Sequence, residues 1–311
     1  MPSACCAVAS RICMGPSLAI GNPQSIVLRT LARRPYRLLH GRPPRADRPC
    51  AAHGARPARR RGDGAARLEH AHAAGSALRR RGAHRPHDRA EELAIELERA
   101  EALQAVGAPV GPPDPRLAPS VHMRGEHAIT LWEHLPVRDR TELPPTELAA
   151  ALAALHAGMR ALDLPVAPLA DRVGHALDLL QDPARTPALA REDRTLLQGT
   201  LARLADRAAT SGPQQILHGE QHPGNLLDTP AGPRFIDLET FCRGPVEFDL
   251  AHAPAAAAAH SPGREPALLE ECRTLSLALA TTWRWDREDT FPDGRAIGVA
   301  WLAEVRARVE G

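Results

Sequence analysis

The chain has 311 residues, of which 43% are hydrophobic and only 3% aromatic, so its core must rest on Leu, Ala and Val. No apolar run reaches the roughly 18 residues of a membrane helix, and the six cysteines form no C-x-x-C pair, which disfavours a zinc site or a disulfide framework and fits a reducing cytoplasm. The net charge of +2 hides a split: residues 1–89 carry 18 Arg against 4 acids, whereas residues 90–311 carry 21 Arg against 33 acids. All 39 basic residues are arginine.

The first 89 residues differ in composition from the rest. From residue 29 to residue 89 Arg, Ala, Gly, Pro and His dominate without a helical or strand period, and such a segment cannot bury enough surface to offset its chain entropy. Three interpretations stay open: a basic arm that binds nucleic acid or membrane, a plain disordered tail, or GC-rich DNA translated in a frame that was never selected. GC-rich codons encode Ala, Arg, Gly and Pro, which favours the third. We therefore expect residues 1–87 to be disordered or non-native, and no particular arginine in the first 89 residues has a strand context that nominates it for a site.

The periodic part of the chain starts near residue 88. Leucines and an alanine at three- to four-residue spacing predict a helix over 88–106, with acids in its first turns and Gly107 after its end. A Pro-rich connection over 109–119 leads to two strands, 120–123 and 128–135, joined by a tight turn. Further helices are predicted over 146–162, 171–180, 188–208, 266–283 and 295–309, around a loop-rich centre at 218–247. This order predicts an α+β protein with segments 1–87, 88–137 and 138–311.

The centre, ILHGEQHPGNLLDTPAGPRFIDLETFCRGPVEFDLAHA, carries the chemistry. Short strands are expected at 226–227 and 234–236, with Asp237 just after the second. Glu220 offers a carboxylate that can orient an attacking hydroxyl and accept its proton. Asn225 and Asp237 offer oxygen ligands, and Mg²⁺ prefers a few protein oxygens together with phosphate and water. These residue types suit phosphoryl transfer, which needs positioning and charge neutralisation more than covalent help.

The motif H-G-x-x-H-P-G-N, followed twelve residues later by I-D, resembles the catalytic and metal loops of the aminoglycoside phosphotransferase family. That family is similar to protein kinases. The resemblance implies a protein-kinase-like two-lobed fold with a small, partial N-lobe and a large helical C-lobe, ATP and Mg²⁺ as cofactors, and a small-molecule hydroxyl as acceptor. It gives Glu220 the catalytic position and gives Asn225 and Asp237 the metal positions. Asp249, in E-F-D-L-A, would brace the catalytic loop.

Two departures from the family pattern stand out. Glu220 replaces the usual Asp, and its extra methylene moves the carboxylate by about 1 Å, which can cost roughly 100-fold in rate unless the loop shifts. Kinase-like enzymes also hold the ATP phosphates with a strand lysine paired to a helix glutamate, and this chain has no lysine. Glu96 is the best match for that glutamate and Glu92 the second, although both could equally be solvated helix acids.

The resemblance also implies a hinge at Trp132, Glu133 and His134, where backbone groups would meet adenine; the alternative is a plain strand end. His218 is expected to hydrogen-bond backbone within its loop. Three tryptophans are expected to pack in the core: Trp283, Trp285 and Trp301. Acids near them suit either a cationic acceptor or a solvated surface: Asp286, Glu288 and Asp289.

The sequence therefore predicts a cytoplasmic, ATP- and magnesium-dependent small-molecule kinase, with neither membrane nor nucleic acid as a partner. The alternative is an impaired or inactive kinase-like protein that lacks the ATP-binding lysine, or a truncated or frameshifted product. The identity of the acceptor molecule cannot be predicted from a short motif, and fold analogy alone does not identify it.

Overall fold

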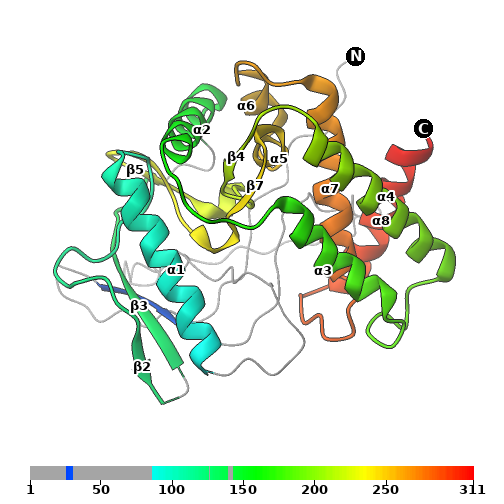
Figure 1. The fold of residues 1–311 in the computed structure, drawn as a ribbon, viewed down its shortest axis with the longest axis horizontal. Coiled ribbons are helices and arrows are strands. Elements are labelled where there is room, and N and C mark those ends of the chain that lie inside the picture. The colour runs from blue at the N-terminus through cyan, green and yellow to red at the C-terminus, as the bar shows by residue number, and fades with distance from the viewer. Residues whose placement is uncertain (1–25, 31–85, 126, 139–142) are drawn as a thin grey trace, which may run out of the picture.

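The computed structural model describes residues 26–30, 86–125, 127–138 and 143–311 (Figure 1). The elements in chain order are β1 (Ile26–Thr30), α1 (Pro86–Ala105), β2 (His122–Arg124), β3 (His127–Glu133), α2 (Pro145–Arg160), α3 (Leu169–Gln181), α4 (Arg191–Thr210), β4 (Gln214–Leu217), η1 (Pro223–Asn225), β5 (Leu226–Thr229), β6 (Gly232–Phe235), η2 (Leu238–Thr240), β7 (Cys242–Pro245), α5 (Val246–Leu250), α6 (Ala255–Ala259), α7 (Pro266–Trp283) and α8 (Gly294–Glu310). They form a small mixed lobe and a large helical lobe.

The small lobe is an antiparallel sheet of order β1-β3-β2 against which α1 packs (Figure 1). The predicted helix and hairpin are both present, and the hairpin turns at Gly125, whose φ of 59° suits a residue without a Cβ. Leu93 and Leu97 bury the inner face of α1. Strand β1 lies within the segment expected to be disordered or non-native; the other residues of 1–85 lie outside the described part of the chain.

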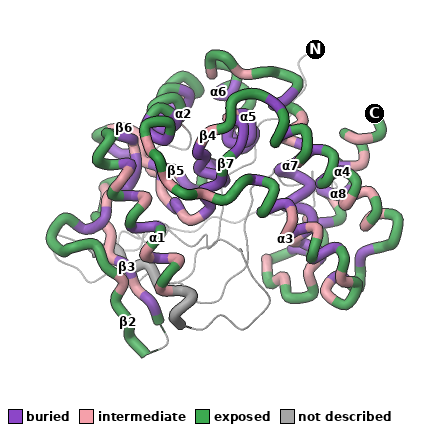
Figure 2. The backbone as a smooth tube through the Cα atoms, viewed as in Figure 1, coloured by how far each residue is buried: buried purple, intermediate pink, exposed green. Residues whose placement is uncertain are grey.

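The large lobe has a core of leucine and alanine, as the composition predicted. Helix α7 packs against α4, α8, α5 and α3, so most of its residues are buried (Figure 2). Each leucine taken fully out of water stabilises the fold by about 2 kcal/mol. Trp285 and Trp301 belong to this core and Trp283 packs against it, which confirms the prediction of core tryptophans. Among the described helices, none combines the length and apolar character that a bilayer crossing requires.

The central region of the chain contains two short antiparallel strand pairs. Strands β5 and β6 form the predicted pair, with Leu226 opposite Phe235. Strands β4 and β7 also pair, with Leu217 opposite Cys242, although 24 residues separate them in the chain. Neither this pairing nor the helices α5 and α6 were predicted. The Pro-rich connection joins the lobes, because Gly111 donates to the Phe235 carbonyl (2.7 Å) while the N–H of Asp114 donates to Leu131 (3.1 Å).

Candidate active site

Asp249, on α5, braces the loop that begins at His218. Its buried carboxylate accepts hydrogen bonds from the backbone N–H groups of His218 (2.9 Å) and Gly219 (2.8 Å) and from the ring of His156 (3.0 Å). Burial alone would raise the pKa of this carboxyl, but the hydrogen bond from His156 and the neighbouring histidines and N–H groups outweigh burial, and the pKa lies below its ordinary value. The structure thus gives Asp249 the contacts of a brace, and makes His156 a partner of that brace.

His218 is fully buried between the loops. Its Nε2 donates to the Ile236 carbonyl (3.0 Å), and its Nδ1 faces the N–H of Glu220 (3.4 Å). The predicted hydrogen bonding of His218 to backbone is therefore confirmed. Desolvation by burial lowers the pKa of this imidazole, so the neutral ring joins the Glu220 loop to the segment before Asp237.

Stability should fall when the pH drops below about 6.5. The unfolded chain binds a proton on His218 below the ordinary pKa of 6.5, whereas the buried ring resists protonation until lower pH. In that window the unfolded state binds more protons, so the free energy of unfolding decreases as the pH falls. Urea unfolding at pH 5 to 8 measures this slope. A His218→Asn variant should flatten the slope, and a His260→Gln variant, which removes an exposed histidine of the same lobe, should keep it; equal slopes in all three proteins would contradict this account.

Gly219 gives the loop its shape. Its φ is +85°, and a Cβ built there would overlap the carbonyl oxygen of Thr240. The Thr240 hydroxyl in turn donates to the His218 carbonyl (2.8 Å). The loop that begins at His218 and the η2 turn therefore lie so close together that only glycine fits at position 219.

Glu220 is buried and makes an ion pair with Arg172 of α3. The same guanidinium donates to the carbonyl of Gly219 (2.9 Å) and lies over the ring of Phe248, 6.0 Å from its centroid. Glu220 is therefore anchored in the interior and is not a solvated loop carboxylate.

Asn225 and Asp237 come together at the end of the β5–β6 pair. The side-chain amide of Asn225 donates to the Glu220 carbonyl (2.9 Å), and its own carbonyl accepts from Ile236 (3.0 Å). Because the amide nitrogen is the donor, the amide oxygen is the atom left for a cation. Asp237 follows β6 with a left-handed φ of 67°, a costly conformation for a residue with a Cβ and one that often marks functional sites. One amide and one carboxylate oxygen fit Mg²⁺, which takes its other ligands from phosphate and water.

Helix α1 is tied to the turn after Asp237. Glu96 is 1% exposed and accepts from the N–H of Leu238 (3.2 Å), while Arg99 donates to the carbonyls of Leu238 (2.9 Å) and Glu239 (2.8 Å). Arg99 also lies over the ring of Phe241, 4.9 Å from its centroid. The alternative that Glu96 is a solvated helix acid is therefore wrong, and its carboxylate lies beside the proposed metal loop.

The segment Trp132–His134 lies where β3 ends and the chain leaves the small lobe. The Trp132 indole donates to Thr130 (2.9 Å), and the N–H of Glu133 donates to the Pro112 carbonyl (3.1 Å). His134 is exposed just beyond the strand. The Glu133 N–H is thus already engaged by the connection between the lobes, so a nucleotide base would need other backbone groups of this segment.

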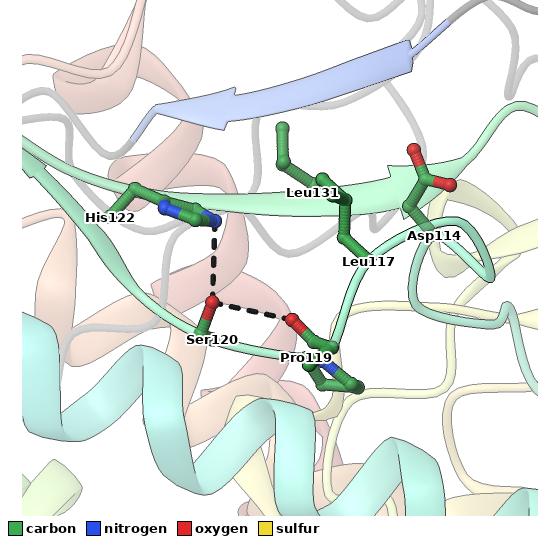
Figure 3. Close-up of a pocket in the computed structure, with 7 residues that line it drawn as sticks. Asp114, Leu117, Pro119, Ser120, His122 and Leu131 are labelled. Atoms are coloured by element: carbon green, nitrogen blue, oxygen red, sulfur yellow. Dashed lines mark hydrogen bonds between the residues drawn. The ribbon is translucent and has the colours of Figure 1, made fainter.

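A small pocket lies on the small lobe, and Figure 3 shows its lining. The lining residues are Asp114, Leu117, Ala118, Pro119, Ser120, His122 and Leu131. Ser120 is hydrogen-bonded to His122 (3.3 Å) and to the Ala118 carbonyl (3.3 Å), and Asp114 is held by Arg116 (2.7 Å). None of the predicted site residues lines it, so we do not assign it to the candidate site.

Two features were not predicted from the sequence: the place of Arg172 and the strand that contains Arg29. Arg172 lies on α3, and the signal that could have found it is a lone cation among the apolar positions Leu169, Val173 and Ala176. Arg29 lies in β1, opposite Thr130. The sequence offered no strand context for an arginine before residue 90, because β1 pairs with residues about a hundred positions later.

The lobes and the loops between them define a kinase-like two-lobed α+β fold. Solved structures with this fold include the amicoumacin kinase in complex with AMP-PNP, Ca²⁺ and its ligand (13% identity, 71% of this chain and 79% of that chain, TM-score 0.54). They also include an aminoglycoside 2′-phosphotransferase with GDP (16% identity, 71% and 83%, TM-score 0.55) and a choline kinase from Streptococcus pneumoniae (16% identity, 71% and 82%, TM-score 0.51). No curated protein matches the chain by sequence.

The family follows from the sequence itself. The model of the phosphotransferase enzyme family, APH, matches residues 67–288, which is most of the chain. The chain therefore belongs to this family, and both the resemblance and the fold class predicted from the sequence are confirmed.

Proposed function

We propose that the chain is a small-molecule kinase that uses ATP and Mg²⁺ to phosphorylate a hydroxyl group. The observation that carries the proposal is the meeting of Glu220, Asn225 and Asp237, tied by the bond from the Asn225 amide to the Glu220 carbonyl (2.9 Å) and the bond from Ile236 to the Asn225 carbonyl (3.0 Å). The similar amicoumacin kinase was solved with AMP-PNP, which supports ATP as the phosphoryl donor. The use of ATP and the buried free thiols Cys242 and Cys272 favour the cytoplasm as its location.

In the proposed reaction the acceptor hydroxyl oxygen bonds to the γ-phosphorus while the bond from that phosphorus to the ADP oxygen breaks. Glu220 orients the hydroxyl and takes its proton. Asn225 and Asp237 would hold Mg²⁺, which neutralises charge on the phosphates. Glu96 keeps the turn after Asp237 in place through the Leu238 N–H, and Trp132–His134 lie at the lobe junction where the base would bind.

The acceptor is a small molecule with a hydroxyl group. Two of the three acids considered for a cationic acceptor are ion-paired: Asp286 pairs with Arg185, and Asp289 pairs with the buried Arg284 (2.9 Å). The third, Glu288, is exposed. The two paired carboxylates therefore do not favour a polycationic acceptor. The competing proposal, a protein that binds nucleotide without turnover, draws on the absence of lysine and on the buried partner of Glu220.

Isothermal titration with Mg-ATP tests the proposal. The parent chain should bind, and Asp237→Asn should weaken binding of Mg-ATP at least about tenfold because one anionic metal ligand is lost. Asp206→Asn, which removes an exposed charge from α4, should bind like the parent. Absence of binding by the parent would rule out the proposed kinase.

A further inference from the structure

We propose that Arg172 is a positioning residue for Glu220, and that it adapts the site to a glutamate where the family pattern has aspartate. The inference rests on the proposed function. It assigns a role to a residue on a helix that lies 48 positions before Glu220 and outside the motif.

The backbone of the loop is already fixed without Arg172. Asp249 holds the N–H groups of His218 and Gly219, and the Asn225 amide holds the carbonyl of Glu220. What these contacts leave undetermined is the Glu220 side chain, which has one more rotatable bond than aspartate. A longer carboxylate on a fixed backbone needs a separate partner to select one conformation.

Arg172 has the geometry of that partner. Its guanidinium is buried and contacts two successive loop residues, donating to the Gly219 carbonyl (2.9 Å) and pairing with the Glu220 carboxylate. The planar fork of arginine can hold two acceptors in one fixed arrangement, which a lysine ammonium cannot do. Helix α3 is itself anchored, because Leu169, Val173 and Ala176 lie in the core. The position of the carboxylate is thus set by a rigid element.

A purely structural ion pair would have the same contacts but different consequences. If Arg172 acted only on stability, its loss would lower the folded fraction and leave turnover per folded molecule unchanged. If it positions Glu220, its loss should lower kcat while leaving the KM for Mg-ATP nearly unchanged, since Arg172 pairs with the carboxylate that takes the proton. The usual residue, aspartate, should then also fail here, because it is too short to reach Arg172.

The test is Mg-ATP hydrolysis with water as the acceptor: the water oxygen bonds to the γ-phosphorus, the bond to ADP breaks, and the proton passes to Glu220. Arg172→Met should lower kcat about 10- to 100-fold, Arg172→Lys should restore part of it, and Glu220→Asp should lower kcat as well. The double variant Arg172→Met with Glu220→Gln should be no slower than Glu220→Gln alone, because the two residues act as a unit.

Arg284→Met is the matched control. Arg284 is also a buried arginine paired with a carboxylate, Asp289, so its loss should lower thermal stability but not kcat per folded molecule. An unchanged kcat in Arg172→Met, additive effects in the double variant, or a Glu220→Asp variant as fast as the parent would overturn the positioning role. A parent that binds Mg-ATP but does not hydrolyse it would overturn the positioning role and favour the competing protein without turnover, whereas a parent that does not bind Mg-ATP rejects the proposed function and the positioning role with it.

Discussion

Asp249→Asn should unfold at markedly lower urea concentration than the parent and should lose most Mg-ATP turnover. The substitution keeps the size of the side chain but places an amide NH₂ where the carboxylate accepts from His218, Gly219 and His156. A buried donor left facing another donor loses its hydrogen bond and keeps the cost of desolvation, so we expect a loss of about 3 kcal/mol in the free energy of unfolding. Urea denaturation followed by circular dichroism measures it.

Activity in the Asp249→Asn variant should fall further than its stability explains. The carboxylate fixes the two N–H groups that precede Glu220, and a misplacement of about 1 Å at a reacting group can cost roughly 100-fold in rate. Turnover should therefore be measured at a temperature at which the variant is still folded. Asp206→Asn, with its exposed carboxylate, should match the parent in both measurements. Normal turnover by folded Asp249→Asn protein would show that the brace is dispensable.

Gly219→Ala should be at least as damaging. An alanine there is strained by the left-handed φ of +85°. Its Cβ would also overlap the Thr240 carbonyl oxygen, so the loop must move away from the η2 turn. We expect a loss of at least about 3 kcal/mol in the free energy of unfolding, with turnover abolished.

Gly212→Ala separates the two causes of that loss. Gly212 also has a left-handed φ, +66°, but no atom lies within 4 Å of the Cβ built there. Its substitution should cost only about 1 kcal/mol from backbone strain. The difference between the two variants in thermal or urea unfolding therefore measures the close approach of the two loops, and equal losses would mean that strain alone matters at Gly219.

Local sequence patterns predicted most of the elements of the described structure. The helix at α1, the hairpin β2–β3 and the helices α2, α3, α4, α7 and α8 show apolar residues at regular spacing, and such periodicity is a property of neighbours in the chain. The motif in the centre placed Glu220, Asn225 and Asp237 on adjoining loops because their spacing is short. Strand β1 and the pairing of β4 with β7 were missed, since these strands contain four or five residues each and pair only with distant partners. The short helices α5 and α6, of five residues each, were missed as well.

The family, the two-part order of elements and the residue types of the candidate site could all be predicted from the amino-acid sequence, since they depend on local spacing and composition. The surroundings of those residues follow from the packing of distant elements. Arg172 pairs with Glu220, Asp249 holds the loop before it, Glu96 and Arg99 contact the turn after Asp237, and position 29 lies in a strand beside β3. Each of these contacts joins residues about 30 to 140 positions apart. Which of many available carboxylates and guanidinium groups meet is set by how the helices and strands pack, and no periodicity in the chain records it.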